Sequence, residues 1–140
     1  MTPSLAAILG YSYVLDSSAV IAFLNREPGM EVIGPVLDVS VISTINWAEV
    51  VTWLSSGRNL SAAGINDARD LLEHRGLTTT PLTEAEAEVA GLLTSLTRQA
   101  GFSLADRVAL ALGMELGLPV LSADRNWARV DVGADVRLIR

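Results

Sequence analysis

The sequence contains no cysteine, and this absence excludes several kinds of chemistry at once. Disulfide bonds, zinc sites built on thiolates and catalysis by a thiol all require cysteine. A chain without disulfides is compatible with the reducing cytoplasm, where we expect this protein to be located. No apolar run approaches the roughly 20 residues that a membrane-spanning helix requires, so we expect no membrane association. The apolar run at residues 5–9 has no basic residue before it and is not typical of a signal peptide.

Lysine is absent as well, so all ten basic residues are arginines. The chain also has 16 aspartate and glutamate residues, which gives a net charge of −6 at pH 7. An acidic chain binds nucleic acid poorly through nonspecific charge attraction. If the protein acts on nucleic acid, metal ions or local arginine clusters must overcome this repulsion. Any phosphate contact of a basic side chain is then made by a planar, bidentate guanidinium group.

Histidine occurs only once, as His74, near the end of a helix that the sequence predicts over residues 61–75. At that position we expect it to cap backbone carbonyls or to contact water rather than to act as a base. Half of the 140 residues are hydrophobic and 19% are charged, which excludes a disordered chain. We expect a loosely attached extension at residues 1–10 and a single domain at residues 11–140.

Strand and helix patterns alternate along the chain. Short β-branched or apolar runs predict strands at residues 11–15, 39–42, 77–82, 119–122 and 136–139. Helical periodicity and capping residues predict helices at residues 17–24, 28–37, 43–57, 61–75, 83–98 and 103–116. This alternation, without a linker or a repeat, is typical of one α/β domain with a mainly parallel sheet.

The stretch from Ser103 to Trp127, SLADRVALALGMELGLPVLSADRNW, holds two carboxylates in an otherwise apolar helix and strand. Its apolar run ends before Gly117, which predicts a buried helix with a serine at its start and a glycine just after its end. Asp106 lies three residues after Ser103 and fits a capping box. Asp124 follows the strand, where aspartate is common in turns. Each acid therefore has a structural explanation beside a functional one.

Two acids in the first half of the chain are open to the same two explanations. Asp16 directly follows the first strand, at the end where open parallel sheets bind ligands, but an aspartate there also caps the following helix. Glu49 lies three residues after Asn46, which again fits the spacing of a capping box. For these acids too, the local sequence leaves both explanations open.

All four of these acids lie at the end of a strand or in the predicted first turn of a helix. They are Asp16, Glu49, Asp106 and Asp124. Right-handed βα crossovers bring such positions to one edge of a sheet, so we expect the four to meet there. Carboxylates placed side by side require a shared proton or a cation. Because only oxygen ligands are available, the pattern favours Mg²⁺ or Mn²⁺ and hydrolysis of a phosphodiester bond.

The motifs around these acids resemble those of the PIN-domain nucleases, and within them the VapC-type toxins of bacterial toxin–antitoxin pairs. The resemblance runs from Tyr13 to the C-terminus, and it rests on VLDSSAVIAFL around Asp16, on INWAEV around Glu49 and on the stretch with Asp106 and Asp124. It implies a PIN-like three-layer α/β sandwich with a central, mainly parallel sheet flanked by helices. It also implies a Mg²⁺-dependent endoribonuclease, with Mn²⁺ as a substitute, in which these acids hold the metal and catalyse. Asp16 and Asp106 are then the firmest ligands.

The resemblance further implies partners and supporting residues. The partners are an RNA substrate, a second copy of the chain in a homodimer, and a cognate antitoxin whose C-terminal segment crosses the active-site cleft. At positions where PIN domains place supporting polar groups, this chain has Ser18, Asn46 and Ser122. Three aromatic residues of the early helices either line the antitoxin groove or belong to the core: Phe23, Trp47 and Trp53.

Two features depart from the family pattern, and neither removes a carboxylate. An extension precedes the first strand, and Arg107 follows Asp106 where a small residue is common. Arg107 either helps to hold RNA phosphate or pairs with one of the ligand acids.

Two other functional classes are compatible with the same residues. One is a catalytically silent PIN-fold module that binds a partner, in which the acids are only helix caps. The other is a different Mg²⁺-dependent phosphoryl hydrolase, such as a phosphatase or a DNA nuclease. A phosphatase with an aspartyl nucleophile is expected to carry a second acid two residues after Asp16, where this chain has Ser18.

Overall fold

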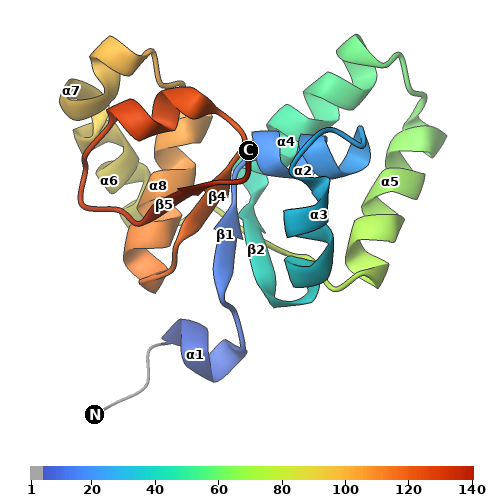
Figure 1. Ribbon diagram of the computed structural model, residues 1–140, viewed down its shortest axis with the longest axis horizontal. Coiled ribbons are helices and arrows are strands. Elements are labelled where there is room, and N and C mark those ends of the chain that lie inside the picture. Colours follow the sequence, from blue (N-terminus) through green and yellow to red (C-terminus); the bar gives the residue numbers. More distant parts are fainter. Residues whose placement is uncertain (1–4) are drawn as a thin grey trace.

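The computed structural model describes residues 5–140, which form a five-stranded parallel sheet with helices on both sides (Figure 1). The strands are β1 Tyr13–Leu15, β2 Ser40–Ser43, β3 Thr78–Thr80, β4 Val120–Ser122 and β5 Val136–Leu138. The α-helices are α1 Leu5–Leu9, α2 Ser17–Leu24, α3 Met30–Ile33, α4 Thr44–Thr52, α5 Ala62–His74, α6 Glu84–Leu92, α7 Thr94–Thr97 and α8 Leu104–Leu116. Shorter helical segments are η1 Gly34–Val39, η2 Trp53–Gly57, η3 Arg98–Ala100 and η4 Arg125–Arg129. The expected sandwich with a central parallel sheet is therefore confirmed.

The order of the strands in the sheet is β3-β2-β1-β4-β5, and all neighbouring pairs are parallel. From β1 the chain first adds β2 and β3 on one side and then returns to add β4 and β5 on the other. The carboxyl ends of the strands lie at one edge, where α2 and α4 begin (Figure 1). The reversal of direction between β1 and β4 creates the crevice in which such sheets bind ligands.

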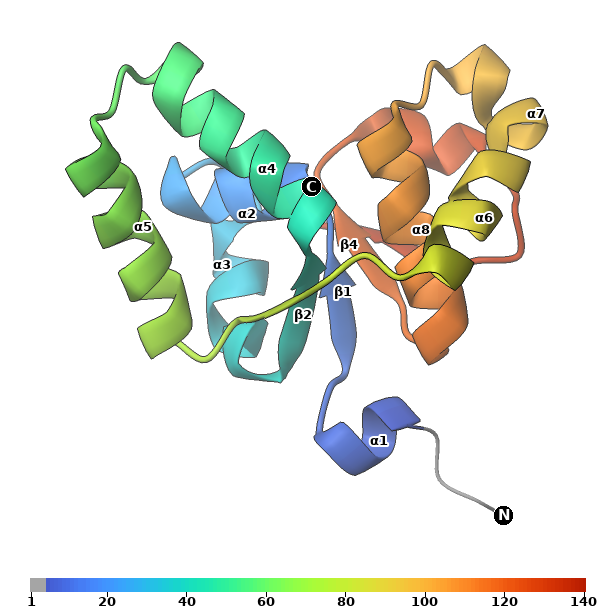
Figure 2. The ribbon, with the colours of Figure 1, turned by 180° about the vertical axis from the view of Figure 1, so that it is seen from behind.

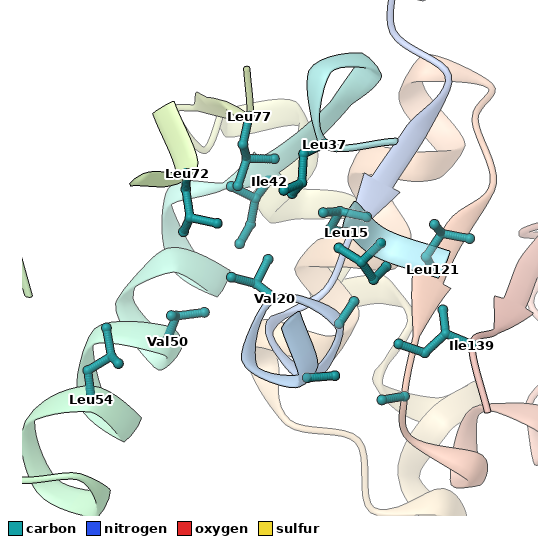
Figure 3. Close-up of a cluster of buried hydrophobic side chains, with 14 residues drawn as sticks. Leu15, Val20, Leu37, Ile42, Val50, Leu54, Leu72, Leu77, Leu121 and Ile139 are labelled. Atoms are coloured by element: carbon teal, nitrogen blue, oxygen red, sulfur yellow. The ribbon is translucent and has the colours of Figure 1, made fainter. Parts of the chain in front are cut away.

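One face of the sheet packs against α2, α3, α4 and α5. The side chains of Leu15, Ile42 and Leu121 point to this face from three neighbouring strands (Figure 3). They meet buried residues of the covering helices, including Val20 and Val50. Each fully buried aliphatic side chain of this kind contributes about 1.5–3 kcal/mol to stability.

The opposite face packs against α8. The residues one position earlier in the same three strands, Val14, Val41 and Val120, belong to this second core, as expected for side chains that alternate across a sheet. A Cβ atom on Gly113 would lie only 2.5 Å from Cγ2 of Val120, so a glycine is needed for α8 to approach β4 this closely. This packing fixes the position of the first turn of α8 beside the carboxyl edge of the sheet.

Several predicted boundaries differ from those in the structure. The helix expected at residues 28–37 becomes α3 followed by the 3-10 segment η1, because Pro35 has no N–H group to continue an α-helix. The helix expected at residues 83–98 is divided into α6, α7 and η3. The spacing of apolar residues on α5 predicts that Leu71 is buried, but Leu71 is 46% exposed. The end of α5 is confirmed, and His74 is exposed there.

The N-terminal segment was expected to be a loosely attached extension. Residues 1–4 lie outside the described part of the chain. Within α1, Ala6 is fully buried, and its carbonyl oxygen accepts a hydrogen bond from the N–H of Tyr11 (2.9 Å). The division into residues 1–10 and a single domain at residues 11–140 stays a prediction. Among residues 5–140, no helix is long and apolar enough to cross a membrane.

Candidate functional site

Asp16 directly follows β1, and its side chain is only 2% exposed. Its Oδ1 accepts a hydrogen bond from the N–H of Ala19 (2.8 Å), so Asp16 is the N-cap of α2. The hydroxyl of Ser122 donates to Oδ2 (2.6 Å), and the hydroxyl of Ser18 lies 2.7 Å from Oδ1 and 2.9 Å from Oδ2. The capping explanation for Asp16 is therefore correct, but the cap uses only part of the bonding capacity of this carboxylate.

Burial raises the pKa of the Asp16 carboxyl to about 7. The hydrogen bonds from Ser122, Ser18 and Ala19 act in the opposite direction, and the charge of Asp106 raises the pKa further. Ser18 is itself held in place, because its Oγ accepts a hydrogen bond from the N–H of Ala123 (2.9 Å). The two predicted supporting serines therefore both contact Asp16, and among residues 5–140 no basic side chain forms an ion pair with it.

Glu49 lies on α4 and is held by a residue of α2. The hydroxyl of Ser17 donates to Oε1 of Glu49 (2.6 Å). Asn46, one turn earlier on α4, donates from Nδ2 to the hydroxyl of Ser17 (3.2 Å) and to the carbonyl of Ala105 (3.1 Å). Asn46 is fully buried and thus links α2, α4 and the first turn of α8. Among the described residues its Oδ1 has no hydrogen-bond partner.

The capping box proposed for Asn46 and Glu49 is wrong. The N-cap of α4 is Ser43, whose side chain accepts a hydrogen bond from the N–H of Ile45. Since α4 begins at Thr44, Glu49 lies in the second turn of the helix rather than the first. The structural explanation for this acid therefore fails, and its contact with Ser17 directs it toward the start of α2.

Asp106 has the capping role that its spacing predicts. The N–H of Ser103 donates to its Oδ2 (2.9 Å), and the N–H of Asp106 donates to Oγ of Ser103 (3.2 Å). Burial raises the pKa of the Asp106 carboxyl, and the negative charges of Glu49 and Asp124 raise it further. The cap and the acidic neighbourhood therefore coexist, because Asp106 uses one oxygen for the helix end while it lies near other acids.

Asp124 has the turn role expected of an aspartate after a strand. Its Oδ1 accepts a hydrogen bond from the N–H of Asn126 (3.0 Å) at the start of η4. Its own N–H donates to the hydroxyl of Ser122 (3.1 Å), the same hydroxyl that donates to Asp16. Ser122 thus joins two of the four acids.

The structure brings the four acids to one edge of the sheet without drawing them into a closed coordination shell. The charge of Asp106 acts on Asp16, and the charges of Glu49 and Asp124 act on Asp106. Among residues 5–140, however, no three histidine, cysteine, aspartate or glutamate side chains lie close enough together to hold one metal ion directly. A hard divalent cation fits the all-oxygen donor set and the repulsion among these acids.

Sequence reasoning missed the role of Ser17, although its place at the start of the helix at residues 17–24 predicts a helix cap. The cap is Asp16, so the hydroxyl of Ser17 is free to contact Glu49 and the carbonyl of Asn46 (3.1 Å). The signal for this role is the pair of serines after Asp16. On α2 their side chains point in different directions, and each supports a different acid.

Comparison with known proteins supports this description of the fold. The sequence profile of the PIN domain matches residues 13–133, which contain all four acids. The chain belongs to the PIN domain family. A comparison with curated proteins finds no match to the sequence.

Solved structures with a similar fold include several from toxin–antitoxin systems. A toxin–antitoxin complex from Klebsiella pneumoniae has a TM-score of 0.69 at 16% identity, over 92% of this chain and 98% of that chain. DNA-bound VapBC from Salmonella typhimurium has a TM-score of 0.66 at 17% identity, over 93% and 99%. VapC20 from Mycobacterium tuberculosis, described as a toxin that cleaves the sarcin–ricin loop, has a TM-score of 0.69 at 16% identity, over 84% and 95%. At these identities the similarity establishes the fold.

Arg107, which departs from the family pattern, has a structural role in this PIN domain. Its NH1 group donates to the carbonyl of Ala90 (3.0 Å) and to the hydroxyl of Thr94 (2.7 Å). It therefore ties α8 to the end of α6, and among the described residues it forms no ion pair with a ligand acid.

The three aromatic residues of the early helices, Phe23, Trp47 and Trp53, are partly buried and pack against the core. Phe23 and Trp47 also line surface pockets. An antitoxin groove formed by them stays a prediction.

Proposed function

We propose that this PIN domain is a Mg²⁺-dependent endoribonuclease of the VapC toxin type, with Mn²⁺ as a substitute. The observation that carries the proposal is the environment of Asp16. This carboxyl is almost fully buried at the carboxyl edge of the sheet, its pKa is raised to about 7, and acids from α4, α8 and the segment after β4 lie nearby. A cation bound there would favour the ionised form of Asp16 and relieve the repulsion among the acids.

The side chains at this edge divide into ligands and residues that position them. Asp16 and Asp106 are the firmest proposed ligands, with Glu49 and Asp124 as further ligands or as acceptors for metal-bound water. When bound, the ion supplies a more acidic water and stabilises charge on the phosphate. Ser18 and Ser122 orient Asp16, and Ser17, held by Asn46, orients Glu49. Such supporting hydrogen bonds fix the direction of the lone pairs that face a metal.

RNA as the substrate and an antitoxin as the partner are supported by structural similarity. VapC20 is described as a toxin that cleaves the sarcin–ricin loop, and other similar structures are VapBC complexes. We therefore propose RNA as the substrate, a cognate antitoxin as the inhibitor, a homodimer as the assembly and the cytoplasm as the location.

The test is RNA cleavage by the purified chain in Mg²⁺ or Mn²⁺, with and without a chelator, and with DNA of the same sequence in parallel. We expect cleavage of RNA that the chelator stops and that Asp16→Asn and Asp106→Asn each slow by on the order of a hundredfold or more. Asp67→Asn is the matched control, because Asp67 is an exposed aspartate on α5, away from the sheet edge. If Asp16→Asn and Asp106→Asn both cleaved RNA as the wild type does, the assignment would be overturned. Preferential cleavage of DNA would identify a DNA nuclease instead.

A catalytically silent binding module is the second candidate, and one observation favours it. Asp16 caps α2 and Asp106 completes a capping box, so both have structural roles that need no metal. Titration with Mn²⁺ separates the candidates. Absence of detectable Mn²⁺ binding, together with unchanged thermal stability in chelator, would support the silent module. A rise in melting temperature with Mn²⁺ that Asp16→Asn removes would support the nuclease.

A further inference from the structure

A second group of acids lies at the far end of α8 from Asp106, outside the proposed nuclease site. Here the first turn of α6 lies beside the last turns of α8 (Figure 2). The two helices enclose a pocket of about 280 Å³ whose walls are mainly apolar. The pocket is lined by Ala85, Glu86, Val89, Ala111, Met114 and Glu115.

Glu86 is the unusual member of this pocket, because a glutamate in the first turn of a helix stabilises the helix dipole and is usually exposed. Its side chain is instead only 3% exposed. The spacing of Thr83 and Glu86 predicts a capping box, but the box is incomplete. Thr83 accepts from the N–H of Glu86 (3.1 Å), but its hydroxyl then donates to Oε2 of Glu86 (2.7 Å), so this oxygen does not bond the backbone of Thr83.

The other oxygen, Oε1 of Glu86, has no hydrogen-bond donor among residues 5–140. Glu86 and Glu115 line the same pocket, and the neighbouring Glu86 carboxylate raises the pKa of the Glu115 carboxyl. Two ionised carboxylates cannot donate to each other, so this contact is satisfied only if a proton or a positive charge is present. Within the described residues, no arginine forms an ion pair with either acid, and the chain has no lysine.

We propose that this pocket, the α6–α8 pocket, receives an arginine or lysine side chain of a partner protein, with its charged end at Glu86 and Glu115. A buried acceptor without a donor is costly, and a guanidinium or ammonium group supplies the missing donor and the missing charge together. The apolar walls formed by Ala85, Val89 and Met114 suit the methylene stem of such a side chain.

Two observations favour a side chain of a protein over a metal ion or a small free amine. Mg²⁺ keeps most of its water shell, and an apolar wall offers that shell few hydrogen bonds. In addition, Met114 is 40% exposed and separates the α6–α8 pocket from a second hollow of about 360 Å³, lined by Gly113, Leu118 and Ala134 among others. A polypeptide lying across Met114 can place one side chain in each hollow, which a small cation cannot do.

The experiment follows the methyl NMR signal of Met114 in the full-length chain during titration with N-acetyl-arginine methylamide. We expect a saturable shift of Met114 and no shift of Met30, which lies on α3 and is the internal control. N-acetyl-citrulline methylamide has the same shape without the charge. We expect its affinity to be lower than that of the arginine probe by about tenfold or more. Equal binding of the two probes, or no saturable shift with either, would contradict the proposal.

Variants and competing cations sharpen the assignment. The double variant Glu86→Gln, Glu115→Gln should lose the Met114 response. Glu88→Gln, an exposed glutamate on the same helix, should keep it. Tighter binding of putrescine would identify a site for small diamines, and tighter binding of MgCl₂ would identify a metal site; either result overturns the assignment to a protein side chain. RNA cleavage should be the same in the double variant and the wild type, so this test is independent of the proposed nuclease activity.

Discussion

The strand-edge cluster (Asp16, Glu49, Asp106 and Asp124) and the α6–α8 pair (Glu86 and Glu115) are two sets of neighbouring carboxylates with very different surroundings. In the strand-edge cluster, the buried Asp16 has two serine hydroxyls and one backbone N–H around its oxygens. In the α6–α8 pair, the buried Glu86 has one hydroxyl at Oε2 and no donor at Oε1.

The difference lies in what each set can bind. Hydroxyls around Asp16 fix the direction of its oxygens and keep the site polar, which suits a hydrated divalent cation. The apolar walls around Glu86 exclude such a hydration shell and suit a cation with an organic stem. A buried carboxylate therefore points to a proposed metal site in one place and to a proposed docking pocket in the other.

The largest expected effect is the loss of cleavage on Asp16→Asn. We expect the rate of RNA hydrolysis to fall on the order of a hundredfold to a thousandfold, because the variant would lose a charged carboxylate from the proposed metal site. Asparagine is also a good N-cap, so α2 should keep its start and the variant should stay folded. Steady-state cleavage and circular dichroism together check this; a folded variant with wild-type rate would remove Asp16 from the site.

The stability of the metal-free protein should fall as the pH rises from about 4 to about 7. The pKa of Asp16 is 3.8 in the reference state and about 7 in the fold, so within this window the folded state holds a proton that the unfolded state has lost. Stability present below pH 3.8 is thus lost by about pH 7, by on the order of 2–4 kcal/mol. Denaturant unfolding in chelator across this range measures the slope.

The same measurement has a built-in control, because Asp16→Asn cannot ionise. The variant should lack this part of the pH dependence and be more stable than the wild type at pH 8. An identical pH slope in the two proteins would show that Asp16 ionises as easily in the fold as in water.

Ser17→Ala should weaken metal binding without removing a ligand. The hydroxyl of Ser17 is the donor that holds Glu49, and loss of such a supporting bond typically lowers metal affinity by about 10-fold to 100-fold. Mn²⁺ titration by calorimetry measures the change, and high Mn²⁺ should restore most of the cleavage rate. Ser12→Ala, at an exposed serine before β1, is the matched control. If Ser17→Ala left affinity unchanged, Glu49 would not need this hydroxyl.

The smallest expected effect concerns the α6–α8 pair. Glu115→Gln removes one of two neighbouring negative charges and supplies a donor for Glu86, so we expect the protein to gain about 0.2–0.5 kcal/mol at pH 7. Glu115 is largely exposed, which keeps the gain small. Chemical denaturation of Glu115→Gln and of Glu88→Gln compares the two positions. A loss of stability in Glu115→Gln alone would contradict the repulsion between Glu86 and Glu115.

Elements with strong local signals were predicted well from the sequence. α8 begins after Ser103 and ends at Gly117, as the capping residues indicate, because both signals act within one turn of the backbone. The parallel sheet followed from the alternation of strands and helices. The convergence of the four acids on one edge followed in turn from the topology, and the PIN domain match covers them all.

Features that depend on contacts between distant segments were not predictable in the same way. The burial of Glu86 arises from the packing of α6 on α8, and the contact of Ser17 with Glu49 joins α2 to α4. Arg107 bonds the carbonyl of Ala90 on α6, which no local pattern around Arg107 indicates. Local spacing also suggested a capping role for Glu49 that the true start of α4 at Thr44 excludes.

The most direct test of the central claim is a crystal structure of the protein soaked with Mn²⁺, in which anomalous scattering locates the metal. We predict an Mn²⁺ ion at the carboxyl edge of the sheet, bound by Asp16 and Asp106 with the remaining positions filled by water, Glu49 or Asp124. We predict no Mn²⁺ in the α6–α8 pocket. A strand-edge cluster that stays free of Mn²⁺ at saturating concentration, with Asp106 still bonded to Ser103 and Asp16 still capping α2, would contradict a metal-dependent nuclease.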